Sequence, residues 1–311
     1  MDVSLVCPCY RSASTLPRLL DSFAKQDFKG EAEIVFVLEP SDDLSEALLT
    51  SRLSSSIRLI ANEERLGPMA CRMKGIEEAK GKYVGFLDAD DFLEPNFLSK
   101  MHGTLVKSEA DIVNCSFYLK GERGEIPYPF PGRNGILTRD EAIRKLLGDL
   151  SIRGFLWSKM FKKELLLEKP MLVLPKDHLF EDVAFCFSSF AKCRSVVTLK
   201  DPLYHYSKEG KTSVTSRQNP NRAQEHLDCF LAMRAYCELL DDPKLREAFF
   251  SSRLRSKISL DFDLFKSKKD GLGKDEAKRI LREFSYIYKE ESKDISSLSG
   301  SPIVKRSLIT D

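Results

Sequence analysis

A chain of 311 residues, 42% hydrophobic and 31% charged, has the composition of an ordinary soluble globular protein. Its length suits one large domain with an appendage, or two modest domains. A formal net charge of +2 argues against a dedicated nucleic-acid-binding protein. No apolar run approaches the roughly 20 residues that cross a bilayer, and the first residues lack the basic region of a signal peptide.

The eight cysteines include no C-x-x-C pair, so neither a zinc ribbon nor a thioredoxin-type motif is predicted. Cys7 and Cys9 are two residues apart on a predicted strand and therefore point to the same face. We expect both to pack as small apolar side chains. We also expect the thiols to stay reduced in the cytoplasm, where disulfides are scarce.

Strands and helices alternate through the first half of the chain. Apolar residues predict a first strand at 3–10 and a helix at 14–26. The segment 32–38 is apolar except for Glu33, as in a strand buried on both faces. The alternation continues with strands at 57–62, 83–91 and 111–119 and helices at 44–54, 67–81 and 96–108. This order predicts an α/β protein with a mostly parallel sheet, helices on both faces, and ligands beyond the carboxyl ends of the strands.

The pattern loosens at residues 121–134, where glycines and prolines predict a long loop. A helix is expected at 138–150, where Thr138 and Glu141 have the spacing of a capping box. Two further amphipathic helices are predicted at 154–168 and 179–193.

The last third of the chain loses its strand signals. Residues 195–216 are typical of a strand pair or of one strand followed by a polar loop, and from Arg222 onward the apolar stripes are all helical. We therefore predict a boundary near Ser216. It separates a domain of residues 1–216 from a helical C-terminal region, residues 217–311, with a role in oligomerisation, acceptor binding or membrane-surface contact.

Three carboxylates, Asp88, Asp90 and Asp91, crowd the end of the strand at 83–91. A cation, a solvated turn or a helix N-terminus would each accommodate their charge. An EF-hand loop is excluded because Phe92 and Leu93 occupy its fifth and sixth positions. An aspartyl-phosphatase motif and a P-loop are also absent. Besides a plain turn, this leaves a divalent cation completed by substrate phosphates, as magnesium is usually bound.

Several segments in order resemble glycosyltransferase family 2. They are VSLVCPCYRSASTLPRLLDSFAKQDF, EIVFVLEPSDD and NEERLGPMACRMKGIEEAKGKYVGFLDADDFLEPNFL, and later LWSKMFKKELL, FEDVAF and PLYHYSKEGKTSVTS. The similarity covers residues 2 to 216 of the sequence. It implies an α/β GT-A-type fold, here followed by an all-helical C-terminal region. It also implies a nucleotide-sugar donor and inversion of the anomeric centre.

The resemblance assigns donor-binding roles to residues at the strand ends. Pro8 and Tyr10 match the Pro-x-Tyr that lines the nucleoside pocket, and Glu39 stands where the family carries an aspartate for the base edge. Arg72 matches an arginine on the nucleotide side of the donor. The sequence departs from the family pattern at Arg11, Pro40, Met73 and Lys74.

The resemblance also gives the aspartates separate roles. Asp90 matches the metal-ligating residue, and Asp88 would hold the ribose, the metal or a metal-bound water, while Asp91 would support them. The expected cofactor is Mn²⁺ or Mg²⁺, acting as a Lewis acid on the leaving diphosphate.

The acceptor hydroxyl needs a positioned carboxylate to take its proton. Asp182 matches the family's base, with Glu181 as the alternative, although two acids in a first helical turn also fit a purely structural role. Trp157 is expected to stack on the acceptor sugar or else to pack in the core.

The polar loop after residue 204 supplies the last expected residues. Lys208, Lys211 and Ser213 match a segment that closes over the donor diphosphate, and such groups suit phosphate. His205 would add a metal ligand or serve a structural role.

The resemblance therefore predicts a cytoplasmic enzyme, at the inner face of the membrane if its acceptor is lipid-linked. It would transfer sugar from a UDP-sugar to a glycan or lipid-linked saccharide in cell-surface polysaccharide synthesis. The alternatives are a nucleotidyltransferase, disfavoured because CPCYRSAST contains no glycine, and an inactive scaffold of a polysaccharide-assembly complex.

The helical region must bury its apolar stripes against another surface. Basic residues beside phenylalanines suggest peripheral membrane contact. However, residues 221–311 hold 18 Lys and Arg against 16 Asp and Glu, a net charge of +2. We therefore expect docking on the first domain and a homodimer contact in preference to a membrane.

Overall fold

The computed structural model describes residues 1–121, 124–148, 150–207, 218–287 and 308–309. The chain divides into two compact units. Unit 1 comprises Met1–Leu137, Phe155–Glu168 and Cys193–Gly210, and unit 2 comprises Thr138–Gly154, Lys169–Lys192 and Lys211–Asp311. The C-terminal helices thus share a unit with two earlier segments, so the division is more interleaved than a single boundary at residue 216.

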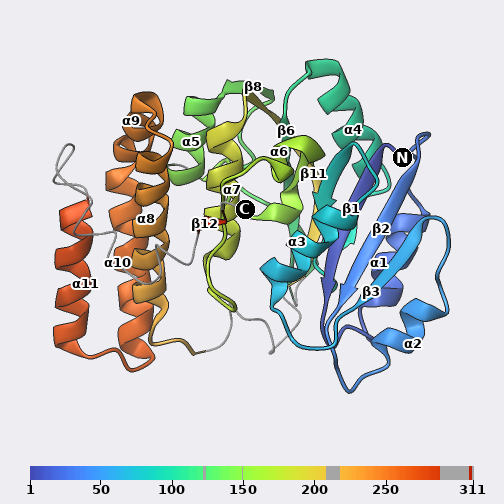
Figure 1. The fold of residues 1–311 in the computed structure, drawn as a ribbon, viewed down its shortest axis with the longest axis horizontal. Helices are drawn as coiled ribbons and strands as arrows, with labels where there is room; N and C mark the ends of the chain where they lie inside the picture. Colours follow the sequence, from blue (N-terminus) through green and yellow to red (C-terminus); the bar gives the residue numbers. More distant parts are fainter. Residues whose placement is uncertain (122–123, 149, 208–217, 288–307, 310–311) are drawn as a thin grey trace. The chain divides into compact units, whose positions relative to one another are not determined.

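Unit 1 is built on a sheet that has ten strands among the described residues, in the order β3-β2-β1-β4-β9-β6-β11-β5, with β7 beside β6 and β8 beside β11 (Figure 1). The β1–β2, β2–β3, β1–β4 and β6–β11 pairs are parallel. The expected α/β architecture with a mostly parallel sheet is confirmed. The strands are β1 (Val3–Cys9), β2 (Ala32–Leu38), β3 (Ile57–Ala61), β4 (Tyr83–Phe86), β5 (Phe92–Leu93), β6 (Ile112–Gly121), β7 (Gly124–Pro127), β8 (Gly135–Thr138), β9 (Lys159–Lys162) and β11 (Ser195–Ser207).

Helices cover both faces of this sheet because successive strand residues point to opposite sides. On one face Leu5 and Cys7 pack in a core with Leu19 of α1 (Leu16–Ala24) and Phe97 of α4 (Phe97–Ser108). On the other face α3 (Pro68–Glu78) lies against β1 and β2. The remaining helices of unit 1 are α2 (Ser45–Thr50), the single 3₁₀ turn η1 (Leu156–Ser158) and α6 (Lys163–Leu167).

Helix α3 approaches β1 closely because it carries a glycine at the contact. A Cβ on Gly75 would lie only 2.3 Å from Cγ1 of Val6. Real side chains do not approach so closely, so glycine sets the spacing between helix and strand. Arg72 is on the same helix one turn earlier, and this packing therefore also fixes its height above the strand ends.

Unit 2 is largely helical. Thr138 and Glu141 form the expected capping box at the start of α5: the Thr138 backbone N–H donates to the Glu141 carboxylate at 2.8 Å. In Figure 1, α8, α10 and α11 run alongside one another, and α8 contacts both of the others. The elements are α5 (Arg139–Gly148), β10 (Met171–Leu172), α7 (Glu181–Lys192), α8 (Arg222–Leu239), α9 (Pro243–Ser251), α10 (Arg253–Lys269), α11 (Lys274–Ile287) and β12 (Leu308–Ile309).

The single helix predicted over residues 154–168 is wrong. The segment forms η1, then β9, then the short helix α6. Strand β9 pairs antiparallel with β4 on one side and with β6 on the other, so it fills the middle of the sheet. Hydrogen bonds on both edges of the strand outweigh a helical spacing of apolar residues, which is only a local preference.

Two further segments can be compared with their predictions. The predicted loop at 121–134 contains β7, which pairs antiparallel with β6. The segment 195–216 begins with one long strand, β11, and its remainder lies outside the described residues.

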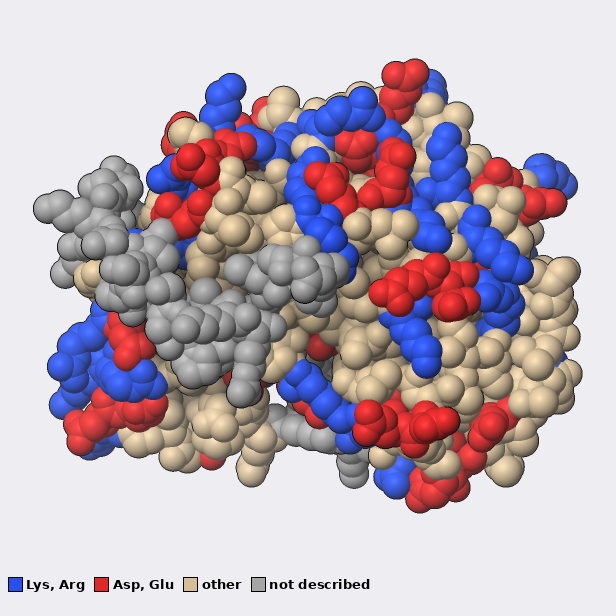
Figure 2. Space-filling view, in the orientation of Figure 1, with Lys and Arg blue, Asp and Glu red and all other residues tan. Residues whose placement is uncertain are grey.

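Figure 2 shows Lys and Arg interspersed with Asp and Glu on the displayed face, in keeping with the small net charge. Within the residues that the structure describes, no helix is both long and apolar enough to cross a bilayer. All eight cysteines are buried and free, so the expectation for Cys7 and Cys9 is confirmed.

Candidate active site

The carboxyl ends of three neighbouring strands bring most of the predicted donor residues to one edge of the sheet. Strand β1 lies between β2 and β4, and both pair with it in parallel. The residues that follow these strands, Tyr10, Glu39 and Asp88, therefore emerge side by side. Pro8 is half-buried near the end of β1.

An ion pair holds the first aspartate. A guanidinium nitrogen of Arg72 donates to Oδ1 of Asp88 at 2.8 Å. The Arg72 side chain is 6% exposed and that of Asp88 is 31% exposed. Because the arginine is buried and the carboxylate partly open, this pair presents a fixed negative group to the solvent side of the strand ends. The contribution of Arg72 to the site in this structure is therefore to hold the Asp88 carboxylate in place.

A buried tyrosine, Tyr204, forms hydrogen bonds to two of the three aspartates. The hydroxyl of Tyr204 donates to Oδ2 of Asp91 at 2.8 Å and accepts the backbone N–H of Asp88 at 3.0 Å. Burial and the nearby carboxylates raise the pKa of Tyr204 well above its ordinary value, so the hydroxyl keeps its proton. The Ser207 backbone N–H donates to Oδ1 of Asp91 at 2.7 Å. Asp91 is thus a fully buried support.

Asp90 is the most open of the three aspartates. Its side chain is exposed, whereas its backbone carbonyl accepts a hydrogen bond of 2.7 Å from Arg18. Partial desolvation by the surrounding loop, followed by repulsion from Asp88, raises the pKa of Asp90 to about 6. A divalent cation would relieve this repulsion, so the donor set fits one.

Asp88 and Asp90 do not make a complete metal cage. Among the described residues, no group of three or more His, Cys, Asp or Glu side chains is arranged to hold a metal ion. Two carboxylates therefore leave several ligand positions to water or to a phosphate-bearing substrate. Metal binding by Asp88 and Asp90 stays a prediction.

Both carboxylate oxygens of Glu39 contact other groups of the protein, which the sequence did not suggest. Its Oε1 accepts the backbone N–H groups of Leu66 at 2.7 Å and Gly67 at 2.5 Å, and its Oε2 lies 3.5 Å from Arg65. The guanidinium of Arg65 also lies 4.5 Å from the ring centre of Tyr10. The glutamate thus orders the loop before α3, and through Arg65 it reaches the expected nucleoside pocket.

The predicted acidic pair begins helix α7 in unit 2. Glu181 is buried at 7% exposure, and Asp182 is half-buried. The backbone N–H of Glu181 donates to the carbonyl oxygen of His178 at 3.3 Å. Both acids lie in the first helical turn, where the helix dipole favours negative charge. Asp182 is the more accessible of the two to a substrate.

Trp157 lies inside an aromatic stack. Its indole is 2% exposed and stacks on Phe155 at 4.8 Å, Tyr204 at 4.5 Å and Tyr206 at 5.3 Å. This position differs from the sugar-facing role expected from the resemblance, because neighbouring rings already cover the indole. In the structure Trp157 packs against Tyr204, which is hydrogen-bonded to Asp88 and Asp91. We refer to the segment between β4 and β5, residues 87–91, as the aspartate loop.

The His205 ring is also engaged by neighbouring side chains. Its ring nitrogens lie 2.7 Å from the Glu94 carboxylate and 2.9 Å from that of Glu125. The ring is stacked on Phe92 at 4.1 Å and on Tyr118 at 4.7 Å. With both nitrogens engaged, His205 takes the structural role of the two that the sequence left open.

Lys208, Lys211 and Ser213 lie outside the described residues. Three site residues escaped the sequence reasoning: Arg18, Tyr204 and Ser207. Each acts on the aspartate loop from a distant part of the chain, and Arg18 also donates to the Ser207 hydroxyl at 2.9 Å. The one available signal was that PLYHYS belongs to the segment resembling the family.

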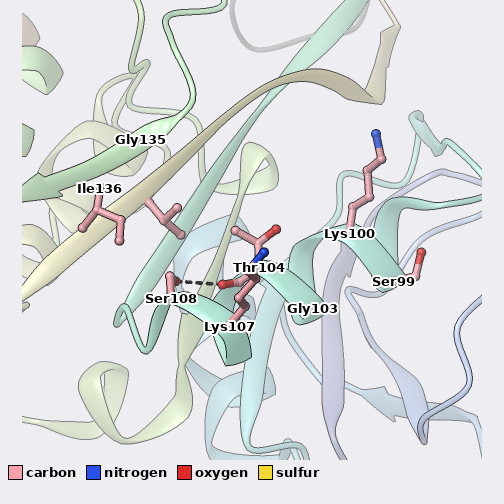
Figure 3. Close-up of a pocket in the computed structure, with 9 residues that line it drawn as sticks. Ser99, Lys100, Gly103, Thr104, Lys107, Ser108, Gly135 and Ile136 are labelled. Atoms are coloured by element: carbon pink, nitrogen blue, oxygen red, sulfur yellow. Dashed lines mark hydrogen bonds between the residues drawn. The ribbon is translucent and has the colours of Figure 1, made fainter.

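A separate open cavity of about 490 Å³ lies along α4 (Figure 3). It contains none of the predicted site residues. Lys100, which lines this cavity, forms an ion pair with Asp201 at 2.6 Å. The residues that line it are Ser99, Lys100, Gly103, Thr104, Lys107, Ser108, Gly135, Ile136 and Val197.

The sequence and the fold match those of a known class. The model of the glycosyl transferase family 2 matches residues 4–161, about half of the chain. The chain belongs to this family. Over 72% of its length it is 27% identical to EpsJ, an uncharacterized glycosyltransferase of Bacillus subtilis. The match spans 66% of EpsJ, just under two thirds of that relative.

Solved structures share the fold. TarS of Staphylococcus aureus, residues 1–349 in complex with UDP-GlcNAc, aligns with a TM-score of 0.63 and 18% identity over 93% of this chain and 91% of that one. A Pyrobaculum calidifontis mannosyltransferase in complex with GDP-Man and Mn²⁺ aligns with a TM-score of 0.57 and 17% identity over 92% and 79%. The expected GT-A-type fold is confirmed by this likeness, which at such identities concerns the fold alone.

Proposed function

We propose that the protein is an inverting glycosyltransferase. It would move a sugar from a UDP-sugar to a hydroxyl of a glycan or lipid-linked acceptor in cell-surface polysaccharide synthesis. The observation that carries the proposal is the cluster of Asp88, Asp90 and Asp91 at the carboxyl edge of the sheet, with Arg72 bound to it. TarS is named as a poly(ribitol-phosphate) beta-N-acetylglucosaminyltransferase. Its complex with UDP-GlcNAc supports the proposed donor class, and its name supports the proposed acceptor class.

The donor nucleotide would lie over the ends of β1 and β2. Tyr10 is 36% exposed, so its ring is available to the nucleoside, and Pro8 shapes the pocket beside it. Glu39 acts here by ordering Arg65 and the loop before α3, which form one wall. The proposal keeps Lys208, Lys211 and Ser213 as partners of the diphosphate.

Asp90 and Asp88 would hold a Mn²⁺ or Mg²⁺ ion together with the donor diphosphate. When bound, the ion neutralises charge that develops on the leaving diphosphate. Arg72 keeps the Asp88 carboxylate oriented, and Tyr204 with Asp91 keeps the loop in place. Because these contacts join protein groups to one another, they would orient the aspartates for the ion and limit their reorganisation during the reaction.

Asp182 would remove the proton from the attacking acceptor hydroxyl, and Glu181 is the alternative base. One carboxylate acting as base gives direct displacement at the anomeric carbon, and direct displacement inverts its configuration. Burial of Glu181 favours Asp182 for a role that requires contact with substrate.

The proposal includes a cytoplasmic location, with contact at the inner membrane face when the acceptor is lipid-linked. The donor and the acceptor saccharide are its proposed partners.

The test combines binding with turnover. UDP-sugars with Mn²⁺ should raise the melting temperature of the protein more than either alone, because ligand binding stabilises the native state. Asp90→Asn should lose this synergy and transfer, whereas Asp21→Asn, an exposed change on α1, should keep both. Asp182→Asn should lower turnover about 10² to 10⁴-fold with donor binding little changed. Full activity of Asp90→Asn, or a product with retained configuration, would contradict the proposal.

A further inference from the structure

Helix α10 presents an apolar face that folding of the described chain leaves uncovered. Ile258, Phe262 and Phe265 are 53%, 57% and 68% exposed. They are spaced four and three residues apart and therefore form one stripe on the helix. We refer to these three residues as the α10 patch.

The opposite face of α10 meets the other helices with small and polar groups. Asp263 is buried and lies 2.6 Å from both His226 and Arg222 of α8. The Ser267 hydroxyl accepts the backbone N–H of Ala223 at 3.0 Å. Since the helix is held by these contacts, together with buried leucines, the phenylalanines of the α10 patch are not needed for its packing.

Positive charge surrounds the α10 patch. Helix α10 carries six Lys and Arg against two Asp, a local net charge of +4. Of the two acids, Asp263 is buried and Asp261 pairs with Lys257 at 2.9 Å. The last turn holds Lys266, Lys268 and Lys269, and the amine of Lys266 lies 4.5 Å from the Phe262 ring centre.

We infer that the α10 patch binds the surface of an anionic lipid bilayer. Large apolar side chains flanked by lysines on one exposed helical face are the composition of an interfacial helix. The apolar groups enter the boundary between headgroups and acyl chains, and the ammonium groups meet lipid phosphates. This surface gives the enzyme a means of reaching a lipid-linked acceptor, and its binding can be tested without any transfer activity.

A second copy of the chain fits the α10 patch less well. A two-fold contact places α10, with its net charge of +4, against the same helix of the other copy, so the like charges would repel. The patch also exposes only roughly 300 Å², given that an aromatic side chain contributes 150–250 Å² when fully buried. A stable interface needs about 800 Å² per partner. Anionic lipid satisfies both the charge and the small area.

Vesicle co-sedimentation of the full chain tests this inference. The probes are phosphatidylcholine vesicles, with and without phosphatidylglycerol. The protein should bind the anionic vesicles and bind the neutral ones far more weakly. Phe262→Ser with Phe265→Ser should weaken partitioning about tenfold or more, because each buried phenylalanine contributes appreciably. Replacing the three lysines of the last turn by Gln should weaken it about 100-fold at low salt, since each contributes about fivefold.

The matched control is Leu44→Ser with Leu53→Ser. These leucines are 74% and 50% exposed in unit 1, and their replacement should leave vesicle binding unchanged. Circular dichroism and UDP-sugar hydrolysis report whether each variant is folded, so a failed binding result is separable from a failed function. Vesicle binding that survives the phenylalanine changes would overturn the inference. So would a dimer in sedimentation velocity that those changes dissociate, without any vesicle binding.

Discussion

The hydroxyl of Tyr204 should contribute much of the stability of the aspartate loop. Tyr204→Phe keeps the ring and its stacking on Trp157 but removes the donor to Asp91 and the acceptor of the Asp88 backbone N–H. The side chain is fully buried, so water cannot replace either bond. A hydrogen bond to a carboxylate contributes about 1.5–3 kcal/mol, and an orphaned buried N–H costs about 1–3 kcal/mol. We therefore expect a loss of about 3 kcal/mol in unfolding free energy.

Urea unfolding at neutral pH measures this loss. With a slope of about 3 kcal/mol per molar, the upper end of the range for small proteins, the midpoint should fall by roughly 1 M. The control is Tyr118→Phe, because the Tyr118 hydroxyl makes no hydrogen bond among the described residues while its ring stacks on His205. Equal midpoints for the two variants would show that the Tyr204 hydroxyl does not hold the loop. Tyr204→Phe should also weaken Mn²⁺-dependent donor binding, since the backbone of Asp88 would lose its anchor.

Two glycine substitutions should change the stability of the protein in opposite directions. Gly75→Ala places a Cβ 2.3 Å from an atom of β1 and should destabilise the protein by about 1–3 kcal/mol, whereas Gly103→Ala has nothing within 4 Å and should stabilise α4 by about 0.5–1 kcal/mol. Thermal melts compare them, and equal shifts would refute the packing argument. Lys162 and Arg194 lower the pKa of Asp111 to about 2. A depressed folded pKa gives stability that is present above pH about 4 and lost as pH falls towards 2. Asp111→Asn should therefore cost roughly 1–2 kcal/mol at pH 7, discounted for the exposed Arg194. It should cost almost nothing near pH 2, as acid-dependent urea titrations would show. A penalty that does not change with pH would contradict this account.

Much of the fold was predictable because the strands of unit 1 carry their own signal. A short apolar run such as residues 34–38 favours a strand covered on both sides, and the turn residues between elements are local. The segment 154–168 was mispredicted for the complementary reason. Its apolar spacing suits a helix, but β4 and β6 offer unpaired edges on both sides of β9. Hydrogen bonds to these two edges can form only after β4 and β6 have assembled in the sheet.

The sequence by itself determined which residue types this protein carries at its strand ends. Asp88, Asp90 and Asp91 follow a strand directly, and their order with the preceding segments identified the family, since such signals depend on neighbours in the chain. Only the tertiary structure decided how the aspartates differ. Asp91 is buried beneath Tyr204, Asp88 is bound to Arg72, and Asp90 is left open. The physical reason is that burial and hydrogen bonding come from other elements of the fold. Arg72 lies 16 positions from Asp88 and Tyr204 lies 113 positions from Asp91, and no local pattern encodes their approach.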